Sequence, residues 1–369
     1  MTNVFPLAPA ASGISPAALT RVAELAGSVD CDPTADRRPV LRSLAEEGVL
    51  DLGLPGSNGG YVDQTRVLSE LAGVCMSTAF SAWAHRMTVE YLALFGNGKL
   101  IEISDSVRSG YRPGSTAMAS TFRAASGQAD LTIDLADDNS GNSTSDTSTS
   151  ETSNNLTATG TIAWASNLYP DAIIVTGMRH GSQRRIVAFE ASRSGVSVSA
   201  SEGLLALDAS KSGSVSLNNV PIDDADVLDI DFKLFVQTVR PVFLTFQTSF
   251  CLGLAAASLS SIGELSGVGA ALSAPLTDRR TELARLSQQL EALAHWLDHR
   301  NDDPPVHILR LRLDAAHLAT AATQLELAIR GGQAYQAKSP TARRVREALF
   351  LPVQSPTEAQ LQWELQHSV

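Results

Sequence analysis

Apolar and polar positions follow a helical period through roughly the first 110 residues. The segment "SPAALTRVAELAG" begins with a Ser-Pro pair at Ser15, and "RPVLRSLAEEGVLDLGL" places apolar residues three and four positions apart. Serine followed by proline is a favoured helix start. A glycine-rich turn, "LPGSNGGY" at 54–61, precedes two more apolar helical segments. We therefore expect an N-terminal helical domain over residues 1–112.

The pattern changes to short alternating runs between residues 113 and 228. These runs are "STAMAST", "ADLTIDLA", "TATGTIAWAS", "DAIIVTGM", "RIVAFEA", "GVSVSA" and "GSVSLNNV". A period of two, interrupted by Gly, Asn or Asp, is typical of half-buried strands. It predicts a middle antiparallel β domain that resembles a barrel. Within it, residues 137–155, "DDNSGNSTSDTSTSETSNN", are too polar to join a core, so we expect a disordered loop there.

Helical spacing returns over residues 229–369, where we expect a helical bundle. The segment "RPVFLTFQTSFCLGLAAASLSSIGEL" is apolar on nearly every side, which predicts a helix at the centre of the bundle. An amphipathic segment, "TDRRTELARLSQQLEALAHWLDH", comes next. Apolar residues then recur from Ile308 to Ile329 at spacings of three and four and end at a Gly-Gly pair, the pattern of a packed helix with a glycine stop.

The last predicted helix begins at a second proline-containing motif. Ser355 is a good N-cap, Pro356 suits the first helical position, and Glu358 stands three residues after the serine. Together they form the pattern of a capping box. Gln354 comes directly before this predicted helix start.

Composition and charge exclude several function classes. The chain is 44% hydrophobic and 18% charged, an ordinary balance for a globular protein, and its formal charge of −11 argues against a nucleic-acid partner. The first residues lack the pattern of a signal peptide, and no segment has the roughly 18 uninterrupted apolar residues of a membrane span. We expect a cytoplasmic protein with no membrane partner, whose Cys31, Cys75 and Cys251 are reduced.

Common catalytic motifs are missing. The seven histidines include no HExxH, the cysteines have no metal-type spacing, and GxSxG is absent. The sequence therefore predicts no metal site and gives no support for a Ser-His-Asp hydrolase.

Four segments, taken in order, resemble the acyl-CoA dehydrogenase superfamily. They are "LAEEGVLDLGLPGSNGGY", "GTIAWASN", "LNNVPI" and "GGQAYQAKSPTARRVREA". The resemblance implies an α+β multidomain fold with an N-terminal helical domain, a middle antiparallel β domain and a C-terminal four-helix bundle. It also implies a flavin-dependent oxidoreductase that holds its flavin between the β domain and the bundle. Homotetramers, or dimers of the same type, are the implied assembly.

The segment "IAWASN" lies where the family's strand edge contacts the flavin ring. Trp164 would supply an aromatic face, next to Ala165, and Ser166 would supply a hydroxyl or its backbone N–H to the polar edge of the ring. A tryptophan in the core of a sheet is the alternative interpretation.

Further cofactor contacts are implied near the end of the bundle. Gly331 and Gly332 would bring bare backbone close to the cofactor, although a plain helix stop fits them equally well. Arg343 and Arg346 could meet a pyrophosphate or a neighbouring subunit, or form solvated surface charge. The family's "R..FG...Q" motif, which contacts the distal part of FAD, has no counterpart in "SAPLTDRRTELARLSQQ". FAD is the expected cofactor, with FMN as the alternative.

The position of the family's catalytic base is occupied by an amide. Aligning "FLPVQSPTEAQ" with the family pattern puts Gln354 where many members carry the glutamate that removes the proton α to a thioester carbonyl. The other position that members use for this base, in the first bundle helix, offers no acid in "RPVFLTFQTSF". Standard desaturation is therefore not favoured.

One branch of the superfamily, the reduced-flavin monooxygenases of the dibenzothiophene and hydroxyphenylacetate type, needs no such base because reduced flavin reacts with O₂. Members of this branch carry a histidine late in the N-terminal domain, and "SAWAHRMTVEYL" offers His85. Its partners would be an aromatic or heterocyclic substrate and an NAD(P)H-dependent flavin reductase. Two alternatives stay open: an acyl-thioester dehydrogenase with its base at another position, and a non-catalytic scaffold of the same fold.

Overall fold

The computed structural model describes residues 13–30, 32–137, 156–300 and 302–367. The chain divides into two compact units. The first comprises Met1–Trp83, Glu202–Ser210 and Arg240–Val369, and the second comprises Ala84–Ser201 and Lys211–Val239. Of the predicted loop 137–155, only Asp137 lies within the described residues, and Cys31 lies outside them.

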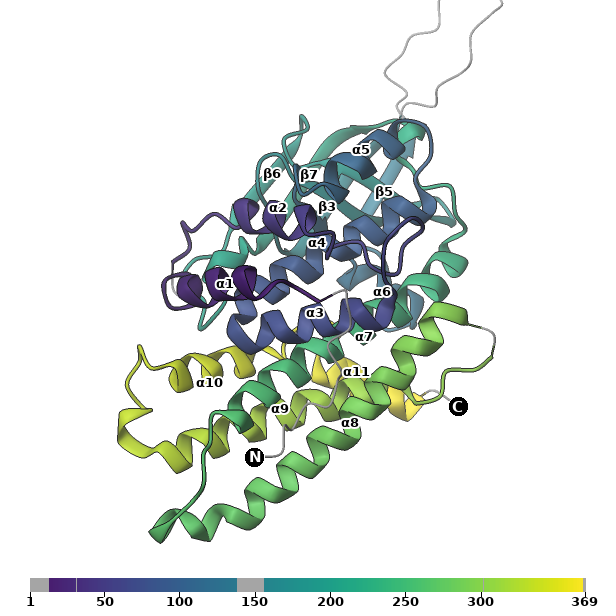
Figure 1. The fold of residues 1–369 in the computed structure, drawn as a ribbon. Helices are drawn as coiled ribbons and strands as arrows, with labels where there is room; N and C mark the ends of the chain where they lie inside the picture. The colour runs from purple at the N-terminus through teal and green to yellow at the C-terminus, as the bar shows by residue number, and fades with distance from the viewer. Residues whose placement is uncertain (1–12, 31, 138–155, 301, 368–369) are drawn as a thin grey trace, which may run out of the picture. The chain divides into compact units, whose positions relative to one another are not determined.

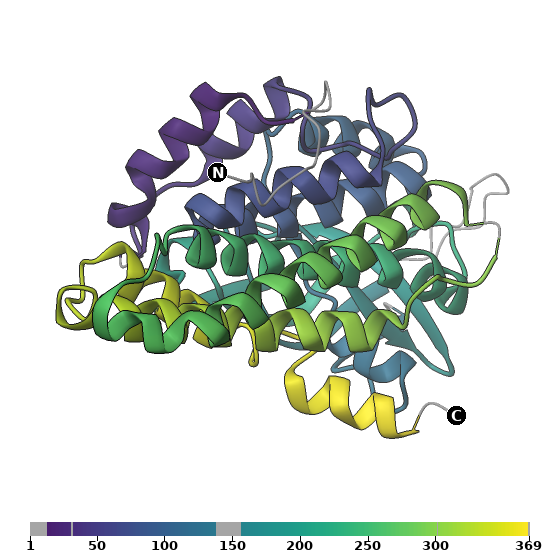
Figure 2. The ribbon, with the colours of Figure 1, turned by 60° about the horizontal axis from the view of Figure 1, so that its bottom comes forward.

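Helices make up the secondary structure of the first unit, apart from short 3-10 turns (Figure 1). They are α1 (Pro16–Val29), α2 (Arg38–Glu46), α3 (Tyr61–Val74), α8 (Ser273–His299), α9 (Ile308–Arg330), α10 (Pro340–Phe350) and α11 (Glu358–His367). Two helices, α4 (Met76–Phe95) and α7 (Phe232–Ser260), contribute residues to both units. Figure 2 shows α8 and α9 lying side by side along their lengths.

Several helix boundaries follow the sequence signals. The Ser15 hydroxyl accepts a hydrogen bond from the Ala18 N–H at 3.1 Å, so it caps α1 as predicted. The predicted helix from Ile308 ends at Gly331, which has φ 65° and thereby provides the left-handed conformation that stops α9. The helical expectations for both ends of the chain are confirmed.

The last helix begins later than predicted. Helix α11 starts at Glu358, and its first turn is capped by Thr357, whose hydroxyl accepts from the Gln360 N–H at 3.3 Å. The Gln360 side chain in turn accepts from the Thr357 N–H at 2.7 Å. This is the reciprocal pattern of a capping box, two residues after the one predicted at Ser355. Thr357 and Gln360 also fit the capping-box spacing, which the sequence analysis did not consider, and the prediction of Ser355 as the cap was wrong.

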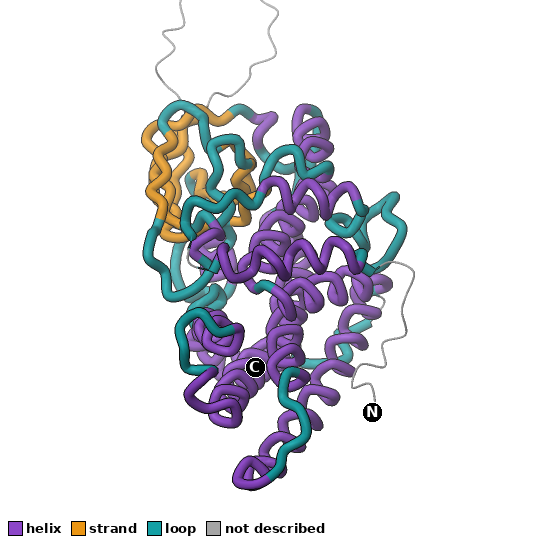
Figure 3. The backbone as a smooth tube through the Cα atoms, turned by 60° about the vertical axis from the view of Figure 1, so that its left-hand side comes forward, coloured by secondary structure: helices purple, strands orange, loops and turns teal. Residues whose placement is uncertain are grey.

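The second unit contains a sheet and two helices, α5 (Lys99–Arg108) and α6 (Ala119–Ala125). Its strands, drawn in orange in Figure 3, are β1 (Gly114–Thr116), β2 (Ile133–Asp137), β3 (Leu156–Ala165), β4 (Ile173–His180), β5 (Gln183–Glu190), β6 (Val196–Ala200) and β7 (Gly213–Ile222). The order is β1-β4-β2-β3-β7-β6, and β5 pairs with β4. Inward residues such as Ile133, Ile174 and Val215 are fully buried.

Two details of this sheet differ from the alternating-run prediction. The run "STAMAST" supplies only the end of β1, after which the chain turns into α6. Because α6 separates β1 from the next strand, the chain returns and enters β2 in the same direction as β1, and β1 and β2 both pair with β4 in parallel. The other pairs are antiparallel, as expected.

Helix α7 is the described helix whose length and apolar composition would allow it to cross a membrane. However, 94% of its most apolar window is buried inside the protein. This is the position expected for the central helix that the sequence predicted.

Candidate functional site

Three serines join the end of β3 to its neighbours in the second unit. The Ser115 hydroxyl donates to the Ser166 carbonyl at 2.6 Å, and the hydroxyls of Ser166 and Ser212 lie 2.8 Å apart. Ser166 is only 5% exposed. The hydroxyl proposed to face a cofactor is therefore engaged by another serine in this structure.

His85 is connected to the same region through Gly114. The Gly114 N–H donates to Nδ1 of His85 at 3.0 Å, and the Gly114 carbonyl accepts from the Asn167 side chain at 3.0 Å. Asn167 follows directly after Ser166, so the structure brings the predicted residues His85 and Ser166 together through β1. A side chain at position 114 would collide with Thr88, because an added Cβ would lie 2.5 Å from the Thr88 Cβ.

The protonation state of His85 follows from this geometry. Nδ1 accepts a hydrogen bond, so the ring proton sits on Nε2. Burial lowers the pKa of His85 to about 4, with the nearby Arg86 charge acting in the same direction and the Val107 carbonyl opposing it. The imidazole is therefore neutral at physiological pH, which suits an orienting role better than that of a cationic acid.

Trp164 and Ala165 lie on β3 just before Ser166. The Trp164 side chain is 47% exposed, whereas Ala165 is buried in the sheet core. Exposure of so large an aromatic side chain leaves a ring face available for stacking, and it argues against the interpretation of Trp164 as a core residue.

The glycine pair and the two arginines lie in the first unit. Gly331 and Gly332 begin a short 3-10 turn after α9, and an added Cβ at either position would have no atom within 4 Å. Arg343 donates to Glu347 at 2.8 Å and to the Val74 carbonyl at 3.0 Å. Arg346 is paired with Asp30. Both arginines thus already have carboxylate partners within the same unit.

Gln354 contacts an arginine that the sequence analysis did not single out. Its Oε1 accepts from Nη2 of Arg312 at 3.2 Å, and Gln354 is 5% exposed while Arg312 is fully buried. The Nε of Arg312 donates to Oε1 of Gln247 at 3.2 Å. Gln354, the residue that the sequence analysis aligned with the family's base, is therefore a neutral amide held next to a guanidinium.

The sequence contains a signal that could have identified Arg312 as a buried residue. It lies four residues after Ile308, on the same helical face as the apolar positions from which α9 was predicted. Gln247 is likewise a polar residue inside the nearly continuous apolar helix α7. A charged or amide side chain on a buried stripe indicates a specific polar partner.

Glu347 is a second buried group that the sequence analysis missed. It is 1% exposed, and its Oε1 accepts from Arg343 and from the Met76 N–H at 3.2 Å. Burial raises the pKa of Glu347 from 4.5 to about 7 against the opposing charge of Arg343, and Asp30 raises it further. This carboxyl thus changes charge near neutral pH.

The Glu347→Gln variant is expected to remove a pH dependence of stability. A raised pKa means that the folded protein holds the proton more tightly than the unfolded chain does. The contribution of Glu347 to the free energy of unfolding is therefore complete below pH 4.5 and is lost as the pH rises through about 7. The loss is on the order of 3 kcal/mol at 1.36 kcal/mol per pKa unit. Chemical denaturation at a series of pH values measures it. Glu282→Gln, at a partly exposed carboxylate of α8, is the control, and parallel profiles for wild type and Glu347→Gln would contradict the assignment.

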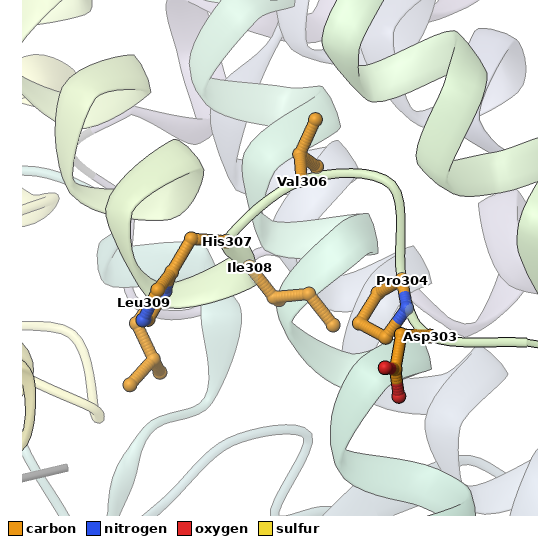
Figure 4. Close-up of a pocket in the computed structure, with 6 residues that line it drawn as sticks. All are labelled: Asp303, Pro304, Val306, His307, Ile308 and Leu309. Atoms are coloured by element: carbon orange, nitrogen blue, oxygen red, sulfur yellow. The ribbon is translucent and has the colours of Figure 1, made fainter. Parts of the chain in front are cut away.

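A surface hollow of about 480 Å³ lies in the first unit, where the chain enters α9 (Figure 4). It is lined by Asp303, Pro304, Val306, His307, Ile308 and Leu309, and none of the predicted site residues is among them. Among the described residues, no group of three or more His, Cys, Asp or Glu side chains is placed to hold a metal ion.

Comparison with known proteins identifies the fold. Residues 17–102 match the family model for the acyl-CoA dehydrogenase N-terminal domain. A search of curated protein sequences gave no match. Butyryl-CoA dehydrogenase from Megasphaera elsdenii superposes with a TM-score of 0.80 at 14% identity, over 95% of this chain and 94% of that chain.

Two further solved structures extend the comparison to bound flavins. A glutaryl-CoA dehydrogenase from Mycobacterium smegmatis in complex with FADH2 gives a TM-score of 0.78 at 14% identity, over 95% of this chain and 93% of that one. KijD3 in complex with FMN and a dTDP-linked amino sugar gives a TM-score of 0.74 at 17% identity, over 95% of this chain and 91% of that one. The resemblance found in the sequence is confirmed: residues 17–102 match the model of the acyl-CoA dehydrogenase N-terminal domain, and the chain has the acyl-CoA dehydrogenase fold, which is also the fold of flavin-dependent oxidoreductases.

Proposed function

We propose that this protein is a flavin-dependent oxidoreductase that acts without the α-proton base of the acyl-CoA dehydrogenases, as a reduced-flavin monooxygenase. The observation that carries the proposal is the environment of Gln354. An amide has no useful basicity, and here its oxygen already accepts a hydrogen bond from Arg312. A group in this state cannot remove the proton that desaturation of an acyl thioester requires.

The residues at the end of β3 fit a flavin ring. The bound flavin would supply the redox chemistry, and the half-exposed Trp164 would stack on it while the segment from Ala165 to Ser166 borders its polar edge. The proposed flavin is FAD, with FMN as the alternative. FMN stays the alternative because, unlike FAD, it contains no pyrophosphate. Arg343 and Arg346 already have carboxylate counter-ions, so neither guanidinium is set aside for a pyrophosphate.

His85 is proposed as a positioning residue in this reaction. Its neutral ring accepts a hydrogen bond from the Gly114 N–H. The Gly114 carbonyl in turn accepts one from the side chain of Asn167, the residue after Ser166. Removing the imidazole would free β1 to shift and would disturb the edge of the sheet that carries Trp164 and Ser166.

An acyl-thioester dehydrogenase with a base at another position is the second candidate. Glu347 favours it in one respect, because its pKa of about 7 suits a general base. Its carboxylate is nevertheless 1% exposed and one oxygen is held by Arg343 and Met76, so a substrate proton would have little access to it. The monooxygenase proposal is therefore the stronger one.

The remaining parts of the proposal concern partners and location. The substrate would be an aromatic or heterocyclic compound, or an acyl thioester under the second candidate. An NAD(P)H-dependent flavin reductase would deliver reduced flavin. A homotetramer or dimer in the cytoplasm, without nucleic-acid or membrane partners, is the proposed working form.

Titration with FAD and with FMN, followed by flavin fluorescence, tests the proposal. We expect saturable binding of at least one flavin, and Trp164→Ala should weaken it about fivefold to tenfold because an aromatic stacking pair contributes about 1 kcal/mol. Trp363→Ala, at a tryptophan of α11 that is 38% exposed, is the matched control and should bind as wild type does. Failure to bind either flavin would overturn the oxidoreductase proposal in favour of a scaffold, and unchanged binding by Trp164→Ala would overturn the placement of the ring.

A further inference from the structure

Arg312 is a fully buried cation without a carboxylate partner among the described residues. Its hydrogen bonds go to neutral oxygens: Gln247 Oε1 at 3.2 Å, the Leu351 carbonyl at 3.3 Å and Gln354 Oε1 at 3.2 Å. Arginine stays charged at all ordinary pH values. An unpaired buried charge is costly, so the position calls for an anion that none of the described residues supplies.

The neighbouring thiol does not fill this role. Cys251 is fully buried near Arg312, whose charge acts to lower the pKa of the thiol. Burial has the larger effect and raises the pKa of Cys251 overall. The cysteine is therefore a neutral thiol at physiological pH.

Two hydrogen-bond donors of this cluster have no partner. They are Nη1 of Arg312 and Nε2 of Gln354, both buried and neither bonded to any described residue. Nη1 belongs to the same guanidinium as Nη2, and Nε2 belongs to the same amide as Oε1. The two unused donors therefore belong to the two groups that share the Arg312–Gln354 hydrogen bond, and a ligand with two acceptor oxygens is the kind of group that would satisfy both.

We propose that Arg312 and Gln354 form a receptor for the carboxylate of a small organic acid, with Arg312 supplying the charge and Gln354 the second donor. A carboxylate matches the single charge of Arg312 and the two donors, whereas a phosphate dianion would leave one charge unbalanced. That this acid is the substrate rests on the proposed function; binding of the carboxylate does not.

One side of the cluster adjoins an exposed segment of the chain. Gln354 retains 5% exposure, and the side chain before it, Val353, is 66% exposed. The chain next to the cluster thus reaches the surface of the first unit, whereas Nε2 of Gln354 itself is buried. Arg312, which donates a hydrogen bond to Gln354, is more deeply buried than Gln354.

Thermal-shift and calorimetric titrations of the full-length chain with sodium butyrate test the proposal. Butyramide is the neutral control of the same shape, and sodium chloride matches the ionic strength. We expect butyrate, but not butyramide, to raise the melting temperature. The affinity for butyrate should fall about 10-fold to 100-fold in Arg312→Met, because a hydrogen-bonded charge pair is lost. Arg310→Met, at an exposed arginine two residues away on α9, should bind butyrate as wild type does.

A second variant keeps the test decisive if Arg312→Met does not fold. Gln354→Glu places a carboxylate within the protein at the same site, so it should abolish butyrate binding while Arg312 stays in place. Equal effects of butyrate and butyramide, or full butyrate affinity in Gln354→Glu, would overturn the receptor. These titrations need no flavin, so the two proposals can fail separately. Flavin binding without butyrate binding would refute the carboxylate receptor alone. Butyrate binding without flavin binding would refute only the oxidoreductase proposal.

Discussion

Gly253→Ala is expected to lower the free energy of unfolding of the first unit by about 3 kcal/mol or more. Gly253 lies where α7 crosses α3, and an added Cβ would be 2.1 Å from the Ser69 carbonyl oxygen and 2.7 Å from the Ser69 Cα. Both are backbone atoms of a helix, so they cannot rotate away as a side chain would. The Ser69 hydroxyl also donates to the Ser249 carbonyl at 2.8 Å and ties the two helices together at this distance.

Gly73→Ala provides the matched control on the same helix pair. An added Cβ at Gly73 would be 3.7 Å from the Ala257 Cβ, which is ordinary van der Waals contact. Alanine is the better helix former, so this variant should gain about 0.5–1 kcal/mol. Urea denaturation followed by circular dichroism compares the two variants. Similar stabilities for Gly253→Ala and Gly73→Ala would show that the helices do not approach as closely as described.

Gln354→Glu is expected to stabilise the protein by about 3 kcal/mol, because it supplies the missing counter-ion of buried Arg312. The new carboxylate would take the place of an oxygen that lies 3.2 Å from Nη2 of Arg312. The adjacent guanidinium would hold the pKa of this carboxyl below its ordinary value. The gain should therefore be present above the unfolded pKa of about 4.3 and lost as pH falls through the lower folded pKa.

The same interaction limits what Gln354→Glu can gain in activity. A carboxylate whose pKa is lowered by Arg312 is a weak base, so any acyl-CoA desaturation that it restores should be small. Gln366→Glu, at an exposed position of α11, should change stability by no more than about 0.5 kcal/mol. Thermal melts from acid to neutral pH compare the variants. A Gln354→Glu protein no more stable than Gln366→Glu would mean that Arg312 does not need an anion.

Local signals in the sequence were enough to predict most elements. The cap at Ser15 and the apolar repeat from Ile308 to Ile329 each depend on residues within one or two helical turns, and both are present as expected. The start of α11 shows the limit of such signals. Two capping patterns two residues apart compete there, and only the packed chain selects Thr357.

The polar contacts around Gln354 could not be predicted in the same way. Arg312 is held by Gln247 and Gln354, which are 65 and 42 residues away along the chain. Whether a charged residue on an apolar stripe is buried or reaches solvent depends on those distant partners. Glu347 is similar, since burial and Asp30 raise its pKa, and its contact with the Met76 N–H comes from a distant part of the chain.

The central claim is that the position of the family's base holds an amide that cannot take a proton from an acyl thioester. The most direct measurement is anaerobic oxidation of short-, medium- and long-chain acyl-CoA by the flavin-loaded wild-type protein, with an artificial electron acceptor. Little or no desaturation at any chain length is the predicted result. Robust oxidation without O₂ that is insensitive to Gln354→Ala would contradict the claim and would show that the protein is an ordinary dehydrogenase with its base elsewhere.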